Sequence, residues 1–471
     1  MFFFILSGII FEFTKLELSM ALTKYKEGSL QELCAISFPL MLSSLSVMAM
    51  LFVDRLFLAK FSLEAFNAAI AAGTLGWAFI LGALVLTSIS QVFVAQYYGA
   101  GRTEKLGEPV WQMIWLSLGM SIAFFPLALF GSDWFFGSSP ETKLQMEYFK
   151  WLMFFGSSYA MYGALCGFFV GQGKVRLITL IAFLANFVNA GLDWVMIFGI
   201  PDLFPSLGVR GAAIATCTSQ MFQVVVLFYL FLKKENRETY QTSNYKIHWD
   251  AMYQCIRIGS PAAIFMTLEI LGWAIYYQLM VDISEKHITV AGIWQSLIIL
   301  FWFITEGVQK GISTLAGNFI GAGKRHLIRS SFFAGIKILL LLFTSILVLI
   351  MGFQEKIVEY FLTTAEISTI DEYRDAIFFC TVTGVLYMLF EGIRYLIAGI
   401  LTAAGDTMFL LATGCISIWI FLIAPVYYIV VKNGSSIEVS SLICTAYAGL
   451  AAFINFVRYK QGKWKTIVIT A

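Results

Sequence analysis

The sequence has few charged residues and few histidines for its length. Only 13% of its 471 residues are charged, against about 25% in a typical soluble domain. The sequence has only three histidines and no Cys-x-x-Cys pair, which argues against a zinc site and against thioredoxin-type chemistry. Seven scattered cysteines, an odd number, do not indicate a disulfide framework. The 31 basic and 29 acidic residues leave a net charge of +2, which gives no reason to expect nucleic-acid binding.

Long apolar segments fill the sequence instead. Apolar residues make up 59% of the chain and aromatic residues 16%. A helix needs about 20 mainly apolar residues to cross a bilayer. We therefore predict an all-α polytopic membrane protein. Its twelve expected spans lie at about 34–58, 65–95, 110–130, 147–171, 177–200, 210–232, 255–281, 288–318, 331–353, 374–403, 408–431 and 438–459.

The basic residues in the loops predict the orientation of the chain. With the N-terminus inside, 18 lysines and arginines fall on the inner side and 9 on the outer side. Basic residues are enriched in cytoplasmic loops. We therefore expect both termini in the cytoplasm and the protein in the cytoplasmic (inner) membrane. The apolar stretch Phe2–Phe11 is too short to span a bilayer, and no basic residue precedes it. Residues 1–28 are thus an N-terminal extension, or translation begins at Met20.

Three landmarks recur in the same order and divide the chain into two halves. Gly99-Ala-Gly101 recurs as Gly321-Ala-Gly323, and Pro39 recurs as Pro261, both at an offset of 222 residues. Gly173 after span four matches Gly405 after span ten. We predict two pseudo-symmetric six-helix bundles, residues 29–232 and 253–471, joined by a cytoplasmic linker at 233–252. Such repeats enclose a central cleft in transporters, so we expect a transporter, not an enzyme.

Ionisable residues inside the spans are the candidate functional groups, because a charge at the bilayer centre costs at least about 2.5–3.5 kcal/mol. Asn186, Asn189 and Asp193 share one face of span five. Their oxygen atoms suit sodium, and a desolvated Asp193 could carry a proton instead. The alternative is a face that hydrogen-bonds to neighbouring helices. Asp54 is a further candidate, unless it is an interfacial carboxylate paired with Arg55.

The second half carries its own acids. Glu269, Trp273 and Tyr276 share one face of span seven, and a carboxylate among aromatic rings suits an organic cation. Tyr387 and Glu391 lie one turn apart in span ten. Arg394 lies three residues beyond Glu391 and could simply neutralise it. Spacing also predicts a self-neutralised pair, Glu306 with Lys310, in span eight.

From about Ser29 onward the chain resembles the multidrug and toxic compound extrusion (MATE) family. The resemblance rests on the order and spacing of several short motifs. They are Pro39 with Asp54, Gln96-Tyr-Tyr-Gly-Ala-Gly101, Asn189-Ala-Gly-Leu-Asp193 with Ile197-Phe-Gly199, Gly208-Val-Arg-Gly211-Ala-Ala-Ile-Ala-Thr216, Gly321-Ala-Gly323, and Gly399-Ile-Leu-Thr-Ala-Ala-Gly405-Asp406-Thr407.

The resemblance implies an antiporter that exports organic cations or amphipathic drugs as sodium ions or protons enter. It gives the roles of the first cation site to Asp54, Asn189, Asp193 and Thr216. Second-half acids used by some members correspond to Glu269 and Glu391, with Tyr387. Glu391 stands where aspartate is more usual, and Arg394 is unexpected beside it.

Several expectations complete this interpretation. Pro39 lacks a backbone donor, so a bend there is cheap, and we predict a hinge. We expect a monomer that acts on small molecules within the lipid bilayer and needs no cofactor beyond the coupling ion. The choice between sodium and proton stays open. The alternative function is a lipid-linked saccharide flippase of the same superfamily, and a membrane enzyme is a more distant one.

Overall fold

The computed structural model describes residues 22–137, 142–361, 367–467 and 469. Within these ranges, twelve helical segments are long and apolar enough to cross a membrane. This confirms the predicted all-α polytopic fold with twelve spans. Most of the extension at 1–28, including the alternative start at Met20, lies outside the described residues.

The first half contains six spans, several of which are interrupted helices. They are α2 (Leu30–Phe61), α3 with α4 (Leu63–Thr87 and Ser90–Gly99), α5 with α6 (Gly107–Pro126 and Ser132–Phe136), α7 with α8 (Lys143–Phe154 and Gly156–Gly171), α9 (Val175–Phe198) and α10 (Val209–Phe231). Ser29 caps α2 by accepting a hydrogen bond from the Glu32 backbone N–H, and the Glu32 carboxylate accepts one from the Gly28 backbone N–H. This pairing resembles a capping box and fixes where α2 begins.

The second half repeats this pattern. Its spans are α12 (Trp249–Ile283), α13 (Glu285–Gly321), α14 (Leu327–Phe361), α15 (Ile367–Ala403), α16 continued by two π-helical segments (Thr407–Ile416, Ser417–Ile423 and Val426–Lys432) and α17 (Ile437–Gln461). The connection between the halves holds a short helix, α11 (Lys234–Tyr240). α12 begins at Trp249, inside the segment expected to be linker. Asp250 lies in its first turn, where a carboxylate is favourable to the helix dipole.

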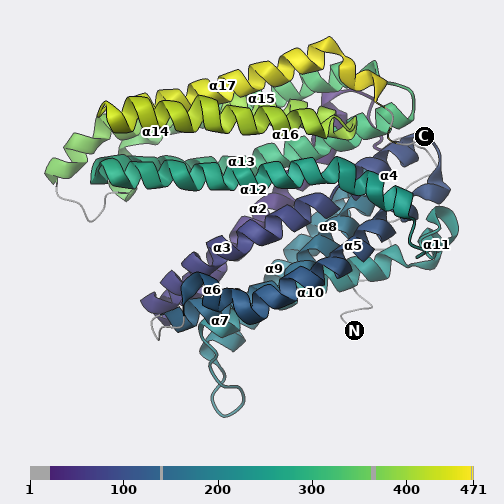
Figure 1. Cartoon of the computed structure of the whole chain (residues 1–471), viewed down its shortest axis with the longest axis horizontal. Helices are drawn as coiled ribbons and strands as arrows, with labels where there is room; N and C mark the ends of the chain where they lie inside the picture. The colour runs from purple at the N-terminus through teal and green to yellow at the C-terminus, as the bar shows by residue number, and fades with distance from the viewer. Residues whose placement is uncertain (1–21, 138–141, 362–366, 468, 470–471) are drawn as a thin grey trace.

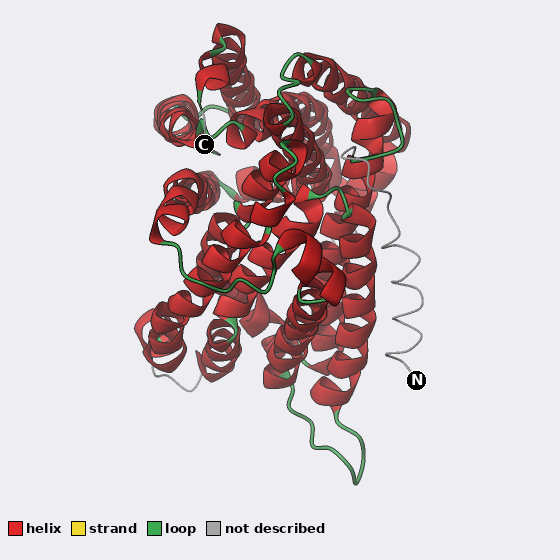
Figure 2. Ribbon diagram, turned by 90° about the vertical axis from the view of Figure 1, so that its right-hand side faces the viewer, coloured by secondary structure: helices red, strands yellow, loops and turns green. Residues whose placement is uncertain are grey.

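The two halves meet at one end and diverge toward the other. Figure 1 shows the first half in purple to teal and the second half in teal to yellow, splaying apart to the left. The contacts between halves are made mainly by α2 and α4 against α13, and by α3 against α12. Figure 2 shows the same molecule from its side, as packed helices joined by loops.

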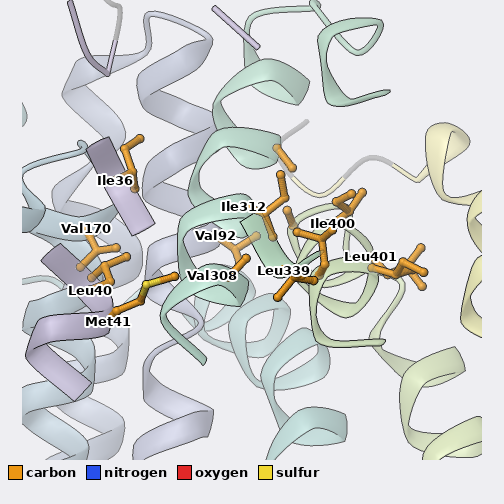
Figure 3. Packing of buried hydrophobic residues seen from close by; sticks show 14 of the residues in the cluster. Ile36, Leu40, Met41, Val92, Val170, Val308, Ile312, Leu339, Ile400 and Leu401 are labelled. Carbon is orange, nitrogen blue, oxygen red and sulfur yellow. The ribbon is translucent and has the colours of Figure 1, made fainter. Parts of the chain in front are cut away.

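An apolar core continues across the junction of the halves. Ile36 and Leu40 of α2 are buried in the same cluster as Val308 and Ile312 of α13. Figure 3 shows this packing, which extends through Ile400 of α15 into the second half. The joined end of the molecule is therefore held by a shared core, rather than by polar contacts alone.

Glycines allow α13 to approach the first half closely. A Cβ atom on Gly307 would lie 2.6 Å from the backbone nitrogen of Met41, and one on Gly311 would overlap Ser37. Two glycines four residues apart present a flat strip to a neighbouring helix, as in other membrane helix pairs. The landmark glycine Gly321 continues this seam, where a Cβ would overlap the backbone of Gln96 in α4.

Candidate ion and substrate sites

The first-half candidates come together on three helices. Asp54 of α2 accepts a hydrogen bond from the Thr216 hydroxyl of α10, with 2.7 Å between the oxygens. Asn189 and Asp193 of α9 lie beside Asp54, close enough to act on its carboxylate electrostatically. All four side chains are buried, with Asn189 and Asp193 completely inaccessible. The structure therefore brings together all four residues that the family resemblance assigned to an ion site.

Several polar atoms of this cluster have no hydrogen-bond partner within the described part of the chain. They are Oδ1 of Asp54, both carboxylate oxygens of Asp193, and both amide atoms of Asn189. Buried polar atoms are normally paired, so such a concentration needs an explanation. Carboxylate and amide oxygens are suitable ligands for a hard cation. A proton shared between the two carboxylates would pair one oxygen of each, so the two aspartates fit either ion.

The neighbouring polar groups of α9 anchor it to α2 instead. The Asn186 side-chain amide donates to the backbone carbonyl and hydroxyl of Ser46, at 2.8 and 2.7 Å. The Thr179 hydroxyl donates to the carbonyl of Pro39, at 2.7 Å. α2 remains one continuous helix through Pro39, the expected hinge. Asn186 therefore fits the alternative interpretation of this face, because it hydrogen-bonds a neighbouring helix.

The second-half acids are linked through one arginine. The Arg394 guanidinium donates to Glu391 on the same helix, with distances of 2.6 to 3.0 Å, and to Glu269 of α12 at 2.8 Å. All three side chains are buried. The sequence placed Arg394 beside Glu391 but did not link it to Glu269. With both carboxyl groups ionised, this triad carries one net negative charge.

Aromatic rings line the same cavity as Glu269 and Glu391. Trp273 packs edge-on against Tyr387 at 6.0 Å between ring centroids, and Trp294 of α13 lies 5.2 Å from Tyr387. Tyr276 is buried in the bundle, with its hydroxyl 3.0 Å from the Ser440 hydroxyl of α17. The following residue, Tyr277, faces the central cavity instead. The expected aromatic face is therefore present, but Tyr276 packs behind it.

One cavity of about 660 Å³ lies between the halves and joins both sets of residues. Its first-half wall includes Asp54, Arg55 and Tyr148, and its second-half wall includes Glu269 and Glu391. The size is within the range of pockets that hold drug-sized ligands. Asn189 and Asp193 are not part of this wall, so Asp54 is the member of the ion cluster nearest the cavity.

A second cavity of about 210 Å³ adjoins the first and shares Glu269 and Trp302 with it. It contains the predicted Glu306–Lys310 pair, with 2.7 Å between amine and carboxylate. The Ser44 hydroxyl of α2 donates to Glu306 at 3.1 Å. The pair forms as expected, and it also contacts the first half.

Two six-helix bundles around a cavity with buried charges define a multi-pass membrane transporter. The sequence profile of the MatE family matches residues 39–195 and 261–429, one segment in each half. The chain belongs to this family, the MATE multidrug efflux transporters, which are not enzymes. The match confirms the resemblance drawn from the motifs.

Individual relatives agree with this assignment. The chain is 24% identical over 454 residues to the probable multidrug resistance protein NorM of Thermotoga maritima, covering 93% of this chain and 94% of the relative. It is 22% identical over 418 residues to the corresponding Bacillus subtilis protein, covering 87% and 90%. Both comparisons extend through both halves of the molecule.

Solved structures share the fold. A MATE protein crystallised in a straight conformation superimposes with a TM-score of 0.85 at 15% identity, covering 96% of this chain and all of the other. The eukaryotic MATE transporter AtDTX14 gives a TM-score of 0.77 at 18% identity, covering 92% and 96%. At these identities the likeness concerns the arrangement of helices alone.

Proposed function

We propose that the protein is a cation-coupled antiporter that exports organic cations or amphipathic drugs across the cytoplasmic membrane. The observation that carries this proposal is the shared cavity, with Asp54 on one wall and Glu269 among aromatic rings on the other. A substrate cation and a coupling ion would thus occupy neighbouring places between the two halves. Relatives named as probable multidrug resistance proteins support a drug-like substrate.

The charge of the cavity walls supports a cationic substrate. The two cavities are lined by four acids and three bases: Asp54, Glu269, Glu306 and Glu391, with Arg55, Lys310 and Arg394. Asp193 adds a further carboxylate behind Asp54. An anionic lipid-linked saccharide, the substrate of the alternative function, would meet this excess of negative charge. A cation over the rings of Trp273 and Trp294 would gain both charge attraction and cation–π contact.

Coupling requires two conformations that bind the ligands differently. The halves are closed at the end where α4 meets α13 and apart at the other end (Figure 1). With both termini in the cytoplasm, the closed end faces the cytoplasm and this conformation opens outward. Loading Asp54 and Asp193 with a proton or sodium would change the charge beside the cavity. The inward-open state requires the glycine seam to separate.

Transport measured under separately imposed sodium and proton gradients identifies the coupling ion. Purified protein in proteoliposomes is given a fluorescent organic cation with a sodium gradient, a proton gradient, both or neither. We expect concentrative transport with at least one of the two gradients and none without them. A protein that moves the cation equally well without either gradient is not an antiporter.

A further inference from the structure

A groove lies on the side of the first half that faces away from the central cavity. It runs between α5, α8 and α10 and has a volume of about 830 Å³. None of its lining residues lines either cavity between the halves. The groove therefore belongs neither to the proposed substrate site nor to the ion site.

The walls of the groove are apolar, and the groove is open to the surroundings of the helix bundle. Trp111 of α5 is buried, whereas Val225 and Tyr229 of α10 are 54% and 62% exposed. These residues lie in membrane-spanning helices, so their exposed surfaces face the hydrocarbon of the bilayer. Met161 of α8 adds a flexible apolar side chain that adapts to an irregular ligand.

One end of the groove is basic. Lys233, Lys234 and Arg237 line it, where α10 ends and α11 begins. The Arg237 Nε atom donates to the Leu232 carbonyl at 2.5 Å, which fixes the guanidinium at the end of α10. The only ion pair of Lys234 within the described ranges is with Glu238, at 3.8 Å on the surface. Such exposed pairs are weak, so Lys234 remains available to an anion.

Of the two acids of α11, Glu238 offsets part of this charge through its weak surface pair with Lys234. The other acid, Glu235, lies on another side of α11, near Lys174. Burial lowers the pKa of Lys174 to about 8, and the Glu235 carboxylate offsets part of that shift. The Lys174 amine in turn lies 5.3 Å from the ring centre of Tyr240, at the end of α11. α11 thus directs Glu235 toward Lys174, and Lys234 and Arg237 toward the groove.

We propose that this groove binds an anionic membrane phospholipid. The phosphate would lie among Lys233, Lys234 and Arg237, and an acyl chain would lie along Trp111 and Val225. An apolar groove with a basic end at the edge of a membrane helix matches both parts of such a lipid. A free phosphate would leave the apolar groove empty, and a neutral lipid would leave the basic residues without a counter-charge.

A lipid bound here would brace the linker against the first half. The Trp111 indole donates to the Thr242 carbonyl of the linker at 2.8 Å, and the neighbouring Trp115 donates to the Tyr245 carbonyl at 2.8 Å. The groove thus adjoins the place where the connection between the halves is held to α5. The proposal does not depend on the transport function.

Native mass spectrometry of the full chain in detergent tests the proposal. Phosphatidylglycerol and phosphatidylcholine with identical acyl chains are added separately. We expect phosphatidylglycerol to bind at least fivefold more tightly, because each basic residue near an anionic headgroup adds about that factor. The triple variant Lys233→Ala, Lys234→Ala, Arg237→Ala should lose this preference. Val225→Trp, which narrows the groove without changing its charge, should weaken binding of phosphatidylglycerol.

A matched control removes three basic residues on the exposed surface outside the groove: Arg176→Ala, Lys460→Ala, Lys463→Ala. This variant should keep the preference for phosphatidylglycerol. Equal binding of the two lipids by the unaltered protein would overturn the proposal. So would an undiminished preference in the groove variant, or an equal loss in the control. Competition by glycerol phosphate as strong as by the lipid would also contradict it, because the acyl chain would then contribute nothing.

Discussion

Gly99 of α4 packs against α13, and Gly321 of α13 packs against α4, at the closed end of the molecule. A Cβ atom on Gly99 would overlap the carbonyl oxygen of Asn318 in α13, and one on Gly321 would overlap that of Gln96 in α4. These are equivalent positions of the two halves, since they are first glycines of the repeated Gly-Ala-Gly landmark. The repeat that divides the sequence therefore also forms a close contact between its halves.

Gly321→Ala should weaken this contact. The added methyl group meets backbone atoms that cannot rotate away, and such overpacking typically costs about 1–3 kcal/mol. We expect a lower midpoint of thermal unfolding in detergent and slower transport. Gly292→Ala is the control, because Gly292 lies on the same helix with open space around its Cβ position. The control should be neutral or slightly stabilising, since alanine favours a helix by about 1 kcal/mol. An equal change in the unfolding midpoint and transport rate for both substitutions would show that the close contact at Gly321 contributes nothing.

Arg394→Gln should strongly destabilise the second half. It leaves Glu269 and Glu391 buried without their shared partner, and breaking a buried ion pair costs about 3–5 kcal/mol. Arg394→Lys should restore only part of the stability, because a lysine cannot donate in the planar fork geometry. Arg458→Gln, which breaks the more exposed pair with Asp406, should cost less. The midpoints of thermal unfolding rank the stability of the three variants. An unchanged midpoint in Arg394→Gln would contradict a structural role for the triad.

Glu269→Gln should weaken binding of an organic cation while leaving the first-half ion site intact. The substitution keeps the aromatic rings and removes the carboxylate charge. A contact to a charged group is worth about 1.5–3 kcal/mol, so the affinity should fall roughly ten- to hundred-fold. Glu391→Gln should chiefly lower thermal stability, because Glu391 makes most of the hydrogen bonds to Arg394. Fluorescent-cation binding in detergent compares the two. Unchanged affinity in Glu269→Gln with a large loss in Glu391→Gln would assign substrate binding to α15 instead.

The orientation of the chain gives a separate prediction. A reporter inserted after Lys246, in the linker, should lie in the cytoplasm, and one inserted after Asn433, between α16 and α17, should lie outside. The 18 to 9 distribution of basic loop residues is the reason. Activity of a compartment-specific reporter at each site measures this. The reverse pair of locations would invert the topology, and this conformation would then open toward the cytoplasm.

Regular spacing predicted the spans and the shared face of Asn189 and Asp193, and the family resemblance added Asp54 and Thr216 from two other helices. Apolar length defines a membrane helix, and the interval from Asn189 to Asp193 places both on one face of α9. The link from Arg394 to Glu269 was not predictable in this way. It depends on how α12 packs against α15, which no spacing within one helix reveals.

Tyr276 shows the limit of the same argument. The spacing correctly places it on the face of Glu269 and Trp273, but that face is wide enough to meet both the cavity and a neighbouring helix. Tyr276 meets α17 at Ser440, and Tyr277, one residue further, faces the cavity. Trp294 had no signal in the sequence, because α13 reaches this cavity only through the packing of the second half.

The most direct test of the account compares coupled and uncoupled movement in the same proteoliposomes. Asp54→Asn and Asp193→Asn each remove a carboxylate that the ion cluster requires, while the substrate residues on α12 and α15 are unchanged. We predict that each variant inserts normally and still exchanges labelled organic cation for unlabelled, but no longer concentrates it when a sodium or proton gradient is imposed. Concentrative transport by either variant at the rate of the unaltered protein would contradict the central claim that these two aspartates couple the ion to the substrate.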